Sequence, residues 1–426
     1  MCYSSVFFLN GKLMQKISLI IILLIVFVNY LGFGLVYPLF APMLFEPDQT
    51  LIDPEASQAY RGAILGILIA LTPLAQFFSA PVFGALSDIK GRKPVLLVGI
   101  SIGCLGYVLA VFGIWMNSLA LLFIYRILVG VSDATAAVAQ ASLADISTKT
   151  NKARRFALYT FSLGLGFTIG PFIGGKLADS NLVSWFNYTT PFIAGGIMCL
   201  INLLLVYVKF PESQKIEAKK PFKPFEKLAQ MGNVFLLKDK RWLFTAGFIL
   251  SFGWAIYNQF IPVLLIDRFA FTQNDISNFY AYSSAWYAFS TGLGTIPLLK
   301  RFSPDKLIPP ALLGASGCLL LMLAITNINY IWGLLPVLLY LLALVFPSAV
   351  TLVSNSTNSD RQGEVLGTYQ SIQASAMGLS PLLVGSLVGV YPFMAALASG
   401  GLLILACLVF RVACRRFVPA KEAVDS

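Results

Sequence analysis

Long apolar runs alternate with short polar segments along almost the whole chain of 426 residues. A helix needs about 20 apolar residues to cross a bilayer, and runs of that length recur twelve times. Because a helix satisfies its own backbone hydrogen bonds in lipid, these runs predict transmembrane helices rather than the strands of a barrel. The predicted spans cover residues 17–40, 61–86, 94–115, 119–142, 156–178, 191–209, 242–265, 277–299, 307–326, 331–353, 363–389 and 391–413.

The longest polar interruption, residues 210–241, separates six predicted spans from six others. It predicts an all-α polytopic membrane protein with twelve transmembrane helices in two pseudo-symmetric six-helix bundles. The N-terminal bundle would cover 1–209, a cytoplasmic linker 210–241, and the C-terminal bundle 242–426. A weak internal repeat supports two related halves. Its matching segments are Gly170-Pro171-Phe-Ile-Gly174 with Ser380-Pro381-Leu-Leu-Val-Gly385, and Gly84–Pro94 with a degraded copy at Gly292-Leu-Gly294.

Composition and charge agree with a membrane protein. The chain is 58% hydrophobic and 12% charged, against about 45–50% and about 25% in soluble domains. With both termini inside, cytoplasmic segments hold 26 of the 30 Lys and Arg residues, which is the asymmetry expected of membrane proteins. The net charge of +11 therefore requires no nucleic-acid partner. Short loops favour a bacterial cytoplasmic (inner) membrane.

The segment between the second and third predicted spans carries the most specific pattern. Glycines permit a tight backbone there, and Pro94 suits the first turn of the next helix. Arg and Lys would anchor the inner face, with Asp88 as their hydrogen-bond acceptor. A turn that only sets the topology is the alternative. The residues of this gate motif are Gly84, Asp88, Gly91, Arg92 and Lys93.

With this motif the sequence resembles the major facilitator superfamily, in particular its twelve-span drug:proton antiporters and, within them, the tetracycline-efflux pumps. The resemblance extends to a first-span segment at Asn29–Pro38, a fourth-span segment at Arg126–Asp145 and Gln362–Gly367 before span 11. A fifth-span signature of antiporters is matched by Gly166, Gly170, Pro171, Gly174 and Gly175.

The resemblance implies alternating access, in which two bundles expose a central site to one side of the membrane at a time. The fifth-span residues would act as a hinge or seal, because glycines allow close helix contact and a proline bends a helix. Simple helix packing is the alternative. Three positions depart from the tetracycline-pump pattern: Asn29 and Gly106 replace acidic residues, and Ile89 replaces a basic one. Tetracycline is therefore not implied as the substrate.

Proton coupling needs a titratable group inside the membrane, and Asp133 near the middle of span 4 is the candidate. A central Asp costs about 2.5–3.5 kcal/mol on insertion scales, so it is a functional hypothesis by default. Arg126 lies two turns earlier on the same face. A structural ion pair between the two residues is the alternative.

Polar and aromatic residues inside the spans form a second, softer set of candidates. Aromatic rings with a few amides suit an amphipathic ligand, although anchoring at the lipid interface or helix packing explains them equally well. These substrate-cavity candidates are Asn29, Trp254, Asn258, Gln259, Tyr282, Trp286, Gln370 and Gln373. Lys176, near the end of span 5, is expected to extend toward the interface.

The sequence therefore favours a proton-coupled antiporter that exports an amphipathic drug-like or cell-made small molecule. A proton-linked importer of a metabolite or metal-chelate is the first alternative, and a non-transporting membrane sensor or scaffold the second. An enzyme is disfavoured: the chain has no histidine, and the six cysteines lack metal-ligand spacing. No catalytic residues, metal or cofactor are predicted, and the expected partners are protons, the substrate and lipid, with a monomer sufficient for the fold.

Overall fold

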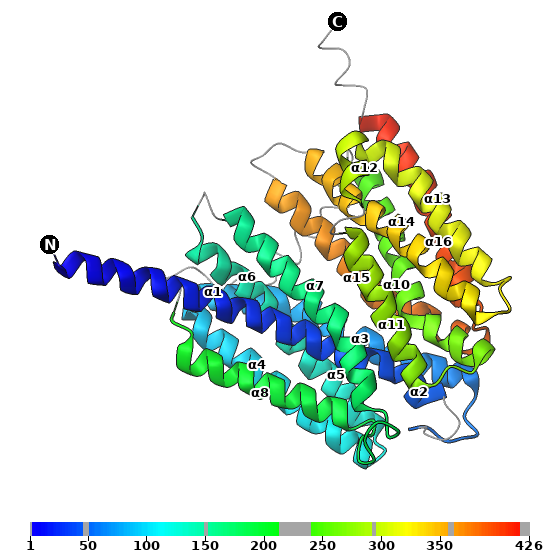
Figure 1. The fold of residues 1–426 in the computed structure, drawn as a ribbon, viewed down its shortest axis with the longest axis horizontal. Coiled ribbons are helices and arrows are strands. Elements are labelled where there is room, and N and C mark those ends of the chain that lie inside the picture. The colour runs from blue at the N-terminus through cyan, green and yellow to red at the C-terminus, as the bar shows by residue number, and fades with distance from the viewer. Residues whose placement is uncertain are drawn as a thin grey trace, which may run out of the picture. The chain divides into compact units, whose positions relative to one another are not determined.

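The computed structural model describes residues 2–45, 51–148, 152–212, 240–291, 295–356 and 362–417, and within these ranges every regular element is helical (Figure 1). The first elements are α1 (Cys2–Val36), η1 (Tyr37–Leu39), α2 (Phe40–Phe45), α3 (Gln58–Lys90), α4 (Arg92–Trp115), α5 (Leu119–Asp133), α6 (Thr135–Ile146), α7 (Lys152–Leu177) and α8 (Thr190–Lys209). They are followed by α10 (Arg241–Phe269), α11 (Gln273–Phe289), α12 (Ile296–Arg301), α13 (Pro304–Met322), α14 (Ile328–Asn355), α15 (Gln362–Val390) and α16 (Met394–Phe417).

Ten segments of the described chain are helical, long and apolar enough to cross a membrane. Ten of the twelve predicted spans coincide with them. The predicted spans at 156–178 and 277–299 fall on α7 and α11, which are helical but are not among the ten. α11 has 17 residues, fewer than the roughly 20 that a perpendicular helix needs to cross the hydrocarbon core.

Several predicted spans are interrupted where the sequence pattern gave one continuous run. In the first span, α1 is followed by the short 3₁₀ turn η1, which begins at Tyr37 and has Pro38 as its second residue. Span 4 divides at Ala134 into α5 and α6. Span 8 was expected to run to residue 299; α11 ends at Phe289, Ser290 and Thr291 follow as a π-helical turn, and Pro297 stands in the first turn of α12, with 292–294 outside the described residues. Hydropathy does not detect such breaks because the residues that make them are themselves compatible with an apolar run.

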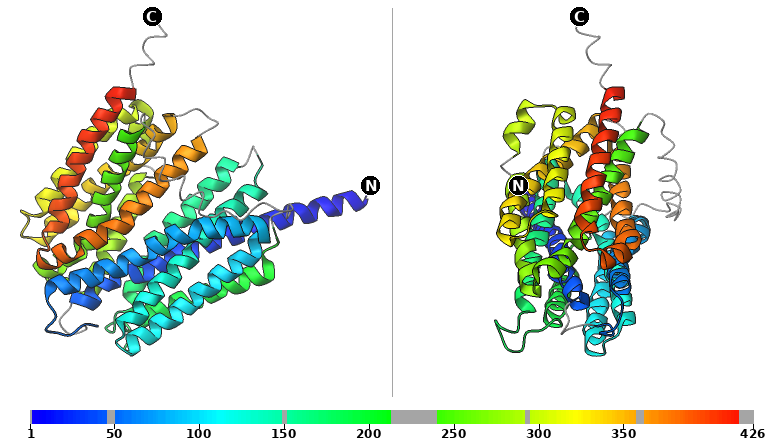
Figure 2. Two further views of the ribbon diagram at one scale, coloured as in Figure 1. Left: turned by 180° about the vertical axis from the view of Figure 1, so that it is seen from behind. Right: turned by 90° about the vertical axis from the view of Figure 1, so that its right-hand side faces the viewer.

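The described helices group into two compact units. Unit 1 comprises Met1–Met43, Leu74–Leu228 and Gln273–Tyr280, and unit 2 comprises Leu44–Pro73, Ala229–Thr272 and Ala281–Ser426. Within unit 1, α1 packs on α7 and α8, and α4 packs on α5 and α8 (Figures 1 and 2). Within unit 2, α10 packs on α15 and α16, and α13 on α14 and α16. The expected bundle boundaries at 209 and 242 stay a prediction, because residues 213–239 lie outside the described ranges, as do Gly292 and Gly294 of the expected repeat.

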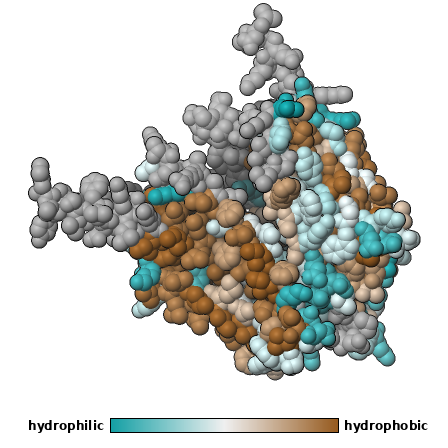
Figure 3. Space-filling model, viewed as in Figure 1, coloured by the Kyte–Doolittle hydropathy of each residue, from teal (hydrophilic) through white to brown (hydrophobic). Residues whose placement is uncertain are grey.

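Large apolar side chains are exposed on the outer faces of several helices. On α8 these include Ile197, Ile201 and Leu204, each more than half exposed, and the face of α8 shows brown, apolar residues in Figure 3. Water would penalise such a surface, whereas lipid does not. This exposure is the pattern expected of helices that contact the hydrocarbon core.

Glycines bring the first half of α3 into backbone contact with α15 inside unit 2. A Cβ atom on Gly62 would collide with the carbonyl oxygen of Gly385 and lie 2.7 Å from the Cα of Gly389, and one on Gly66 would collide with the carbonyl oxygen of Pro381. These are backbone atoms that cannot move aside as a side chain can. Close approach of two backbones through small residues is a common way for helices to associate in lipid.

We predict that Gly66→Ala loosens the contact between α3 and α15. The change should increase hydrogen exchange in both helices, because the added methyl group separates the two backbones. The matched control is Gly317→Ala on α13, where nothing lies within 4 Å of the added atom. Equal exchange profiles for the two variants, measured by mass spectrometry in the same detergent, would show that the glycine contact is not required.

Candidate functional site

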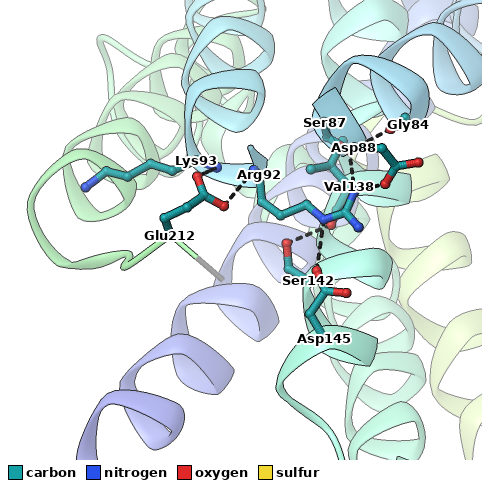
Figure 4. Close-up of polar contacts among 9 residues, drawn as sticks. All are labelled: Gly84, Ser87, Asp88, Arg92, Lys93, Val138, Ser142, Asp145 and Glu212. Carbon is teal, nitrogen blue, oxygen red and sulfur yellow. Dashed lines mark hydrogen bonds and ion pairs between the residues drawn. The ribbon is translucent and has the colours of Figure 1, made fainter. Parts of the chain in front are cut away.

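The junction of α3 and α4 is a single residue, Gly91. It has φ 94° and ψ 158°, a backbone region that is essentially reserved for glycine. No side chain of Gly91 can cap the new helix, and the carboxylate of Glu212 does so instead. Its two oxygens accept hydrogen bonds from the backbone N–H groups of Arg92 (2.8 Å) and Lys93 (3.1 Å) (Figure 4). A negative group at this position also complements the helix dipole.

The Arg92 guanidinium joins three elements beside this cap. Its Nη1 donates to Asp88 at 2.7 Å and to the Ser87 hydroxyl at 2.6 Å, and its Nε donates to Asp145 on α6 at 2.9 Å (Figure 4). The Arg92 side chain is only 7% exposed. A buried guanidinium needs such a full set of acceptors, and its planar fork can reach several at once. We call Ser87, Asp88, Arg92, Asp145 and Glu212 the junction network.

The junction network corrects the expected role of one motif glycine. The turn was predicted to extend over the segment from Gly84, but α3 continues to Lys90 and Gly84 lies inside it. Nothing is within 4 Å of a Cβ atom built on Gly84. Its carbonyl oxygen accepts a hydrogen bond from Ser87. Gly91 alone supplies the backbone freedom that the junction requires, because the reversal takes place at that one residue.

A second polar group lies where span 4 is interrupted. Asp133 is the last residue of α5, and α6 begins at Thr135. The side-chain amide of Gln76 on α3 donates to the backbone carbonyl of Asp133 at 3.3 Å, and Asn29 on α1 donates to the Thr135 hydroxyl at 3.2 Å. Four elements of unit 1 thus bring polar groups to one point within the spans. We call Asn29, Gln76, Asp133 and Thr135 the mid-span cluster.

Arg126 lies on α5, two helical turns before Asp133, and is fully buried. Its guanidinium lies over the rings of Phe40, 5.0 Å from the centroid, and Phe33, 5.7 Å from the centroid. Cation–π contacts of this kind favour a charge in a desolvated place. An ion pair between Arg126 and Asp133 stays a prediction.

The fifth-span glycines lie on α7, and three of them face α1. Cβ atoms on Gly166, Gly170 and Gly174 would strike the backbone of α1 at Phe27, Gly34 and Leu35 respectively. These residues occur every fourth position and so form one stripe along the helix. Pro171 lies in the same contact, 3.0 Å from a Cβ built on Gly34. The stripe shows close packing within unit 1, and a hinge role stays a prediction.

The fourth motif glycine on α7 faces a different helix. Gly175 abuts Ser277 on α11, and its carbonyl oxygen accepts a hydrogen bond from Gln273 at 2.8 Å. The neighbouring Lys176 donates to Asn274 at 3.0 Å. Lys176 was expected to extend toward the membrane interface, and in the structure it binds the first turn of α11 instead. The α7–α11 contact is therefore polar, unlike the α7–α1 contact.

Aromatic candidates gather in unit 2. The Trp254 ring on α10 stacks against Tyr287, with centroids 6.2 Å apart, and meets the edge of Phe346 at 5.8 Å. Tyr282 packs against both Trp286 and Trp332, and its hydroxyl donates to the Trp332 carbonyl oxygen at 3.2 Å. The structure therefore places Trp254 in one aromatic group and Tyr282 with Trp286 in another.

The amide candidates of unit 2 differ in what they bind. Gln259 is buried, donates to the Met377 carbonyl oxygen at 3.2 Å and accepts from Ser380 at 3.3 Å. These bonds tie α10 to α15, which is a packing role. Asn258 and Gln373 are half-buried, and Gln370 is exposed. These three residues have exposed surface and stay candidates for contact with a ligand.

Comparison with known proteins decides the family. The sequence model of the Major Facilitator Superfamily matches residues 22–381, which is most of the chain. The chain belongs to the major facilitator superfamily. Transport rather than an enzymatic reaction is therefore its activity, and a small molecule its substrate. The twelve-helix, two-bundle architecture expected from the sequence is the fold of this family.

Relatives and solved structures agree with the family. The tetracycline resistance protein, class H, of Pasteurella multocida is 29% identical over 378 residues, covering 86% of this chain and 88% of that protein. A bacterial homologue of the human lysosomal transporter Spinster has a TM-score of 0.74 at 14% identity, covering 94% of this chain and 97% of that one. A D-xylose–proton symporter has a TM-score of 0.70 at 16% identity, covering 95% and 97%.

Several site residues could not be found from the sequence. Glu212 caps α4 from 120 positions away, and Gln76 reaches Asp133 from another helix. No local pattern marks such partners, because a single polar residue in or beside an apolar run has no sequence signature. Tyr287 and Phe346, which pack against Trp254, were not predicted for the same reason. Asp145 did lie in the fourth-span segment, but its partner Arg92 could not be assigned without the fold.

We predict that Gly91→Ala destabilises the protein by about 1–3 kcal/mol, since Ala must adopt a backbone region that L-residues avoid. Its added methyl group would also lie 2.6 Å from an oxygen of Glu212. Gly84→Ala is the matched control from the same motif and should be neutral or slightly stabilising, because Ala favours a helix. Thermal unfolding of the two variants in one detergent distinguishes them. A Gly84→Ala variant as unstable as Gly91→Ala would contradict the assignment.

We also predict that Glu212→Gln weakens the start of α4 by about 1 kcal/mol, the usual value of an N-cap. An amide keeps one oxygen acceptor and turns an NH₂ group toward the second backbone N–H. The loss should appear as a lower unfolding temperature and faster hydrogen exchange at Arg92 and Lys93. Glu55→Gln in an exposed loop is the control. An unchanged exchange rate at Arg92 and Lys93 would refute the capping role.

Proposed function

We propose that this protein is a proton-coupled antiporter that exports an amphipathic drug-like or cell-made small molecule by alternating access. The observation that carries the proposal is the position of Asp133 at the break between α5 and α6, within a predicted span of a transporter fold. A carboxyl group at such a place can bind and release a proton as the site changes sides.

The surroundings of Asp133 support a role in proton exchange. Ala134 keeps right-handed helical dihedrals, but the hydrogen bonds around it follow a tighter i to i+3 pattern, and Gln76, Asn29 and Thr135 supply polar groups nearby. Irregular backbone inside a membrane is tolerated where it lines a polar or water-filled region. A carboxylate needs this polarity in order to lose its proton, since burial in hydrocarbon alone would keep it neutral.

The export direction rests on the relatives and on the fifth-span sequence. The relative from Pasteurella multocida bears the name of a tetracycline resistance protein, and a cell resists a drug when a pump removes it. We infer the same direction here, with a different cargo. Asn29 stands where the tetracycline pumps are expected to have an acid, and in this chain it binds Thr135. Trp254, Tyr282, Trp286, Asn258, Gln370 and Gln373 are the proposed contacts for the cargo.

In the proposed cycle, two six-helix bundles (1–209 and 242–426) rock about the cargo site, joined by the 210–241 linker. The junction network holds α3, α4 and α6 together at one end of the first bundle, so that this end moves as a body. The α7 glycines let α7 lie directly on α1, and its polar contact with α11 is a candidate for a seal that opens and closes. Both termini are proposed to face the cytoplasm, in a bacterial inner membrane, with a monomer as the working unit.

An importer is the second candidate, and one observation favours it. The fold is shared with a D-xylose–proton symporter at a TM-score of 0.70, so the same scaffold accommodates proton-linked uptake. A symporter would load proton and cargo together, and its cargo here would be a metabolite or metal-chelate. The two candidates differ in the direction in which an imposed pH gradient drives the same compound. A sensor or scaffold without transport would show no driven flux at all.

We predict that Asp133→Asn abolishes transport driven by an imposed pH gradient in inverted membrane vesicles. Asn has nearly the same shape but cannot carry a proton, so the variant should insert and fold normally. Asp133→Glu should keep partial activity. The control is Asp179→Asn in the loop after α7, where the backbone N–H of Asn181 binds the side-chain oxygen that Asn retains. Normal gradient-driven uptake by Asp133→Asn would exclude Asp133 as the proton carrier.

A further inference from the structure

Two thiols meet at the middle of unit 1. The Sγ atom of Cys104 lies 3.3 Å from that of Cys199, and Cys199 in turn donates to the carbonyl oxygen of Ile100 at 3.5 Å. Cys104 is the thirteenth of the 24 residues of α4, and Cys199 is the tenth of the 20 residues of α8. The pair therefore lies near the midpoint of both helices. None of the contacts proposed above for proton or cargo involves it.

The packing of α4 against α8 holds the two sulfur atoms together. One turn from the thiols, Tyr107 of α4 packs on Gly195 and Gly196 of α8. The Cβ atom of Tyr107 lies 3.2 Å from a Cβ built on Gly196. A Cβ on Gly103, the residue before Cys104, would be 3.3 Å from the Cys199 sulfur. Close packing at the pair and one turn away thus places α4 directly against α8, with the two sulfur atoms in contact. A disulfide has its sulfur atoms about 2.05 Å apart, so the thiols need to close by little more than 1 Å.

The surroundings of the pair determine which kind of oxidant can react with it. Cys199 is buried and Cys104 is half-buried, beside apolar residues of α4 that are exposed, Leu105 (53%) and Val108 (50%). Access is therefore from the lipid-facing surface. Exchange with a soluble disulfide requires a thiolate, and a charge is costly in such a place. No group of three or more metal-ligating side chains was found among the described residues, so the pair lacks the third ligand of a common protein metal site.

We propose that Cys104 and Cys199 are a redox-active pair that a lipid-soluble quinone oxidises to an α4–α8 disulfide. Two S–H bonds break and one S–S bond forms. The two electrons and two protons pass to the quinone, which becomes the quinol. Because each electron can leave together with its proton, no thiolate has to form in the apolar region. The product is a covalent brace inside unit 1, closing a loop of about 95 residues.

The test uses the full-length protein in lipid vesicles under anaerobic conditions with tetramethyl-1,4-benzoquinone. Every ring carbon of this quinone is substituted, which blocks addition of a thiol to the ring. After treatment the protein is denatured and its free thiols are counted with a maleimide–polyethylene glycol. The wild-type chain has six cysteines, and its count should fall to four and return to six with dithiothreitol. A peptide linking Cys104 to Cys199 should appear by mass spectrometry, two hydrogens lighter than the reduced pair.

Serine variants separate this pair from the other cysteines. Cys104→Ser and Cys199→Ser should each keep all five remaining thiols, since the partner is gone. The double variant Cys318→Ser/Cys407→Ser removes two other buried cysteines and should still fall from four thiols to two. Oxidation should raise the unfolding temperature of the wild type and of the double variant only, because a cross-link restricts the unfolded chain.

Two results would overturn the proposal. They are a wild-type count that stays at six and a loss of thiols in Cys104→Ser. A sulfonated, charged benzoquinone serves as the access control. If it oxidises the pair as fast as the lipid-soluble quinone does, then the proposed route from the lipid is wrong.

Discussion

The absence of water in the hydrocarbon core is the constraint on which the structure depends. Backbone N–H and C=O groups must find partners inside the protein, so a continuous helix is the default and every interruption has to be compensated. One interruption inside a span of unit 1 shows how, since the carbonyl group of Asp133, beside Ala134, accepts a hydrogen bond from Gln76. The same need for partners is met between two spans, where Glu212 accepts from the free N–H groups at the start of α4. The places where the helix rule is broken are also the places where polar side chains gather.

Close approach between helices follows from the same constraint. Lipid is as apolar as a leucine side chain, so burying leucine gives little reason for helices to associate. Contact between backbones gives more, and this requires residues without side chains. α7 meets α1 at Gly166, Gly170 and Gly174, and α3 meets α15 at Gly62 and Gly66. The glycines that the sequence marks as a motif are thus partly a packing device. Their use as a hinge would be a second role of the same stripe.

The sequence predicted the fold class because hydropathy and helix length are nearly sufficient in a membrane. It also predicted Gly91, Arg92 and Asp88 as one motif, and the structure brings the last two together at 2.7 Å. It did not predict the breaks in spans 1, 4 and 8, because proline and alanine fit an apolar run. It could not predict Glu212 or Gln76, since a partner over a hundred positions away, or on another helix, leaves no local signal. Gln259 stays a predicted cargo contact, and the structure adds the hydrogen bonds by which its amide joins α10 to α15.

If Asp133 carries the proton that is exchanged for cargo, then cargo binding to the purified protein should release that proton. Purified protein in weakly buffered detergent solution is mixed with each compound of a panel, and a pH indicator reports the protons released. For a compound that the protein transports, the account predicts about one proton released per chain by the wild type and none by Asp133→Asn. Release of the same size from the Asp133→Asn variant would contradict it.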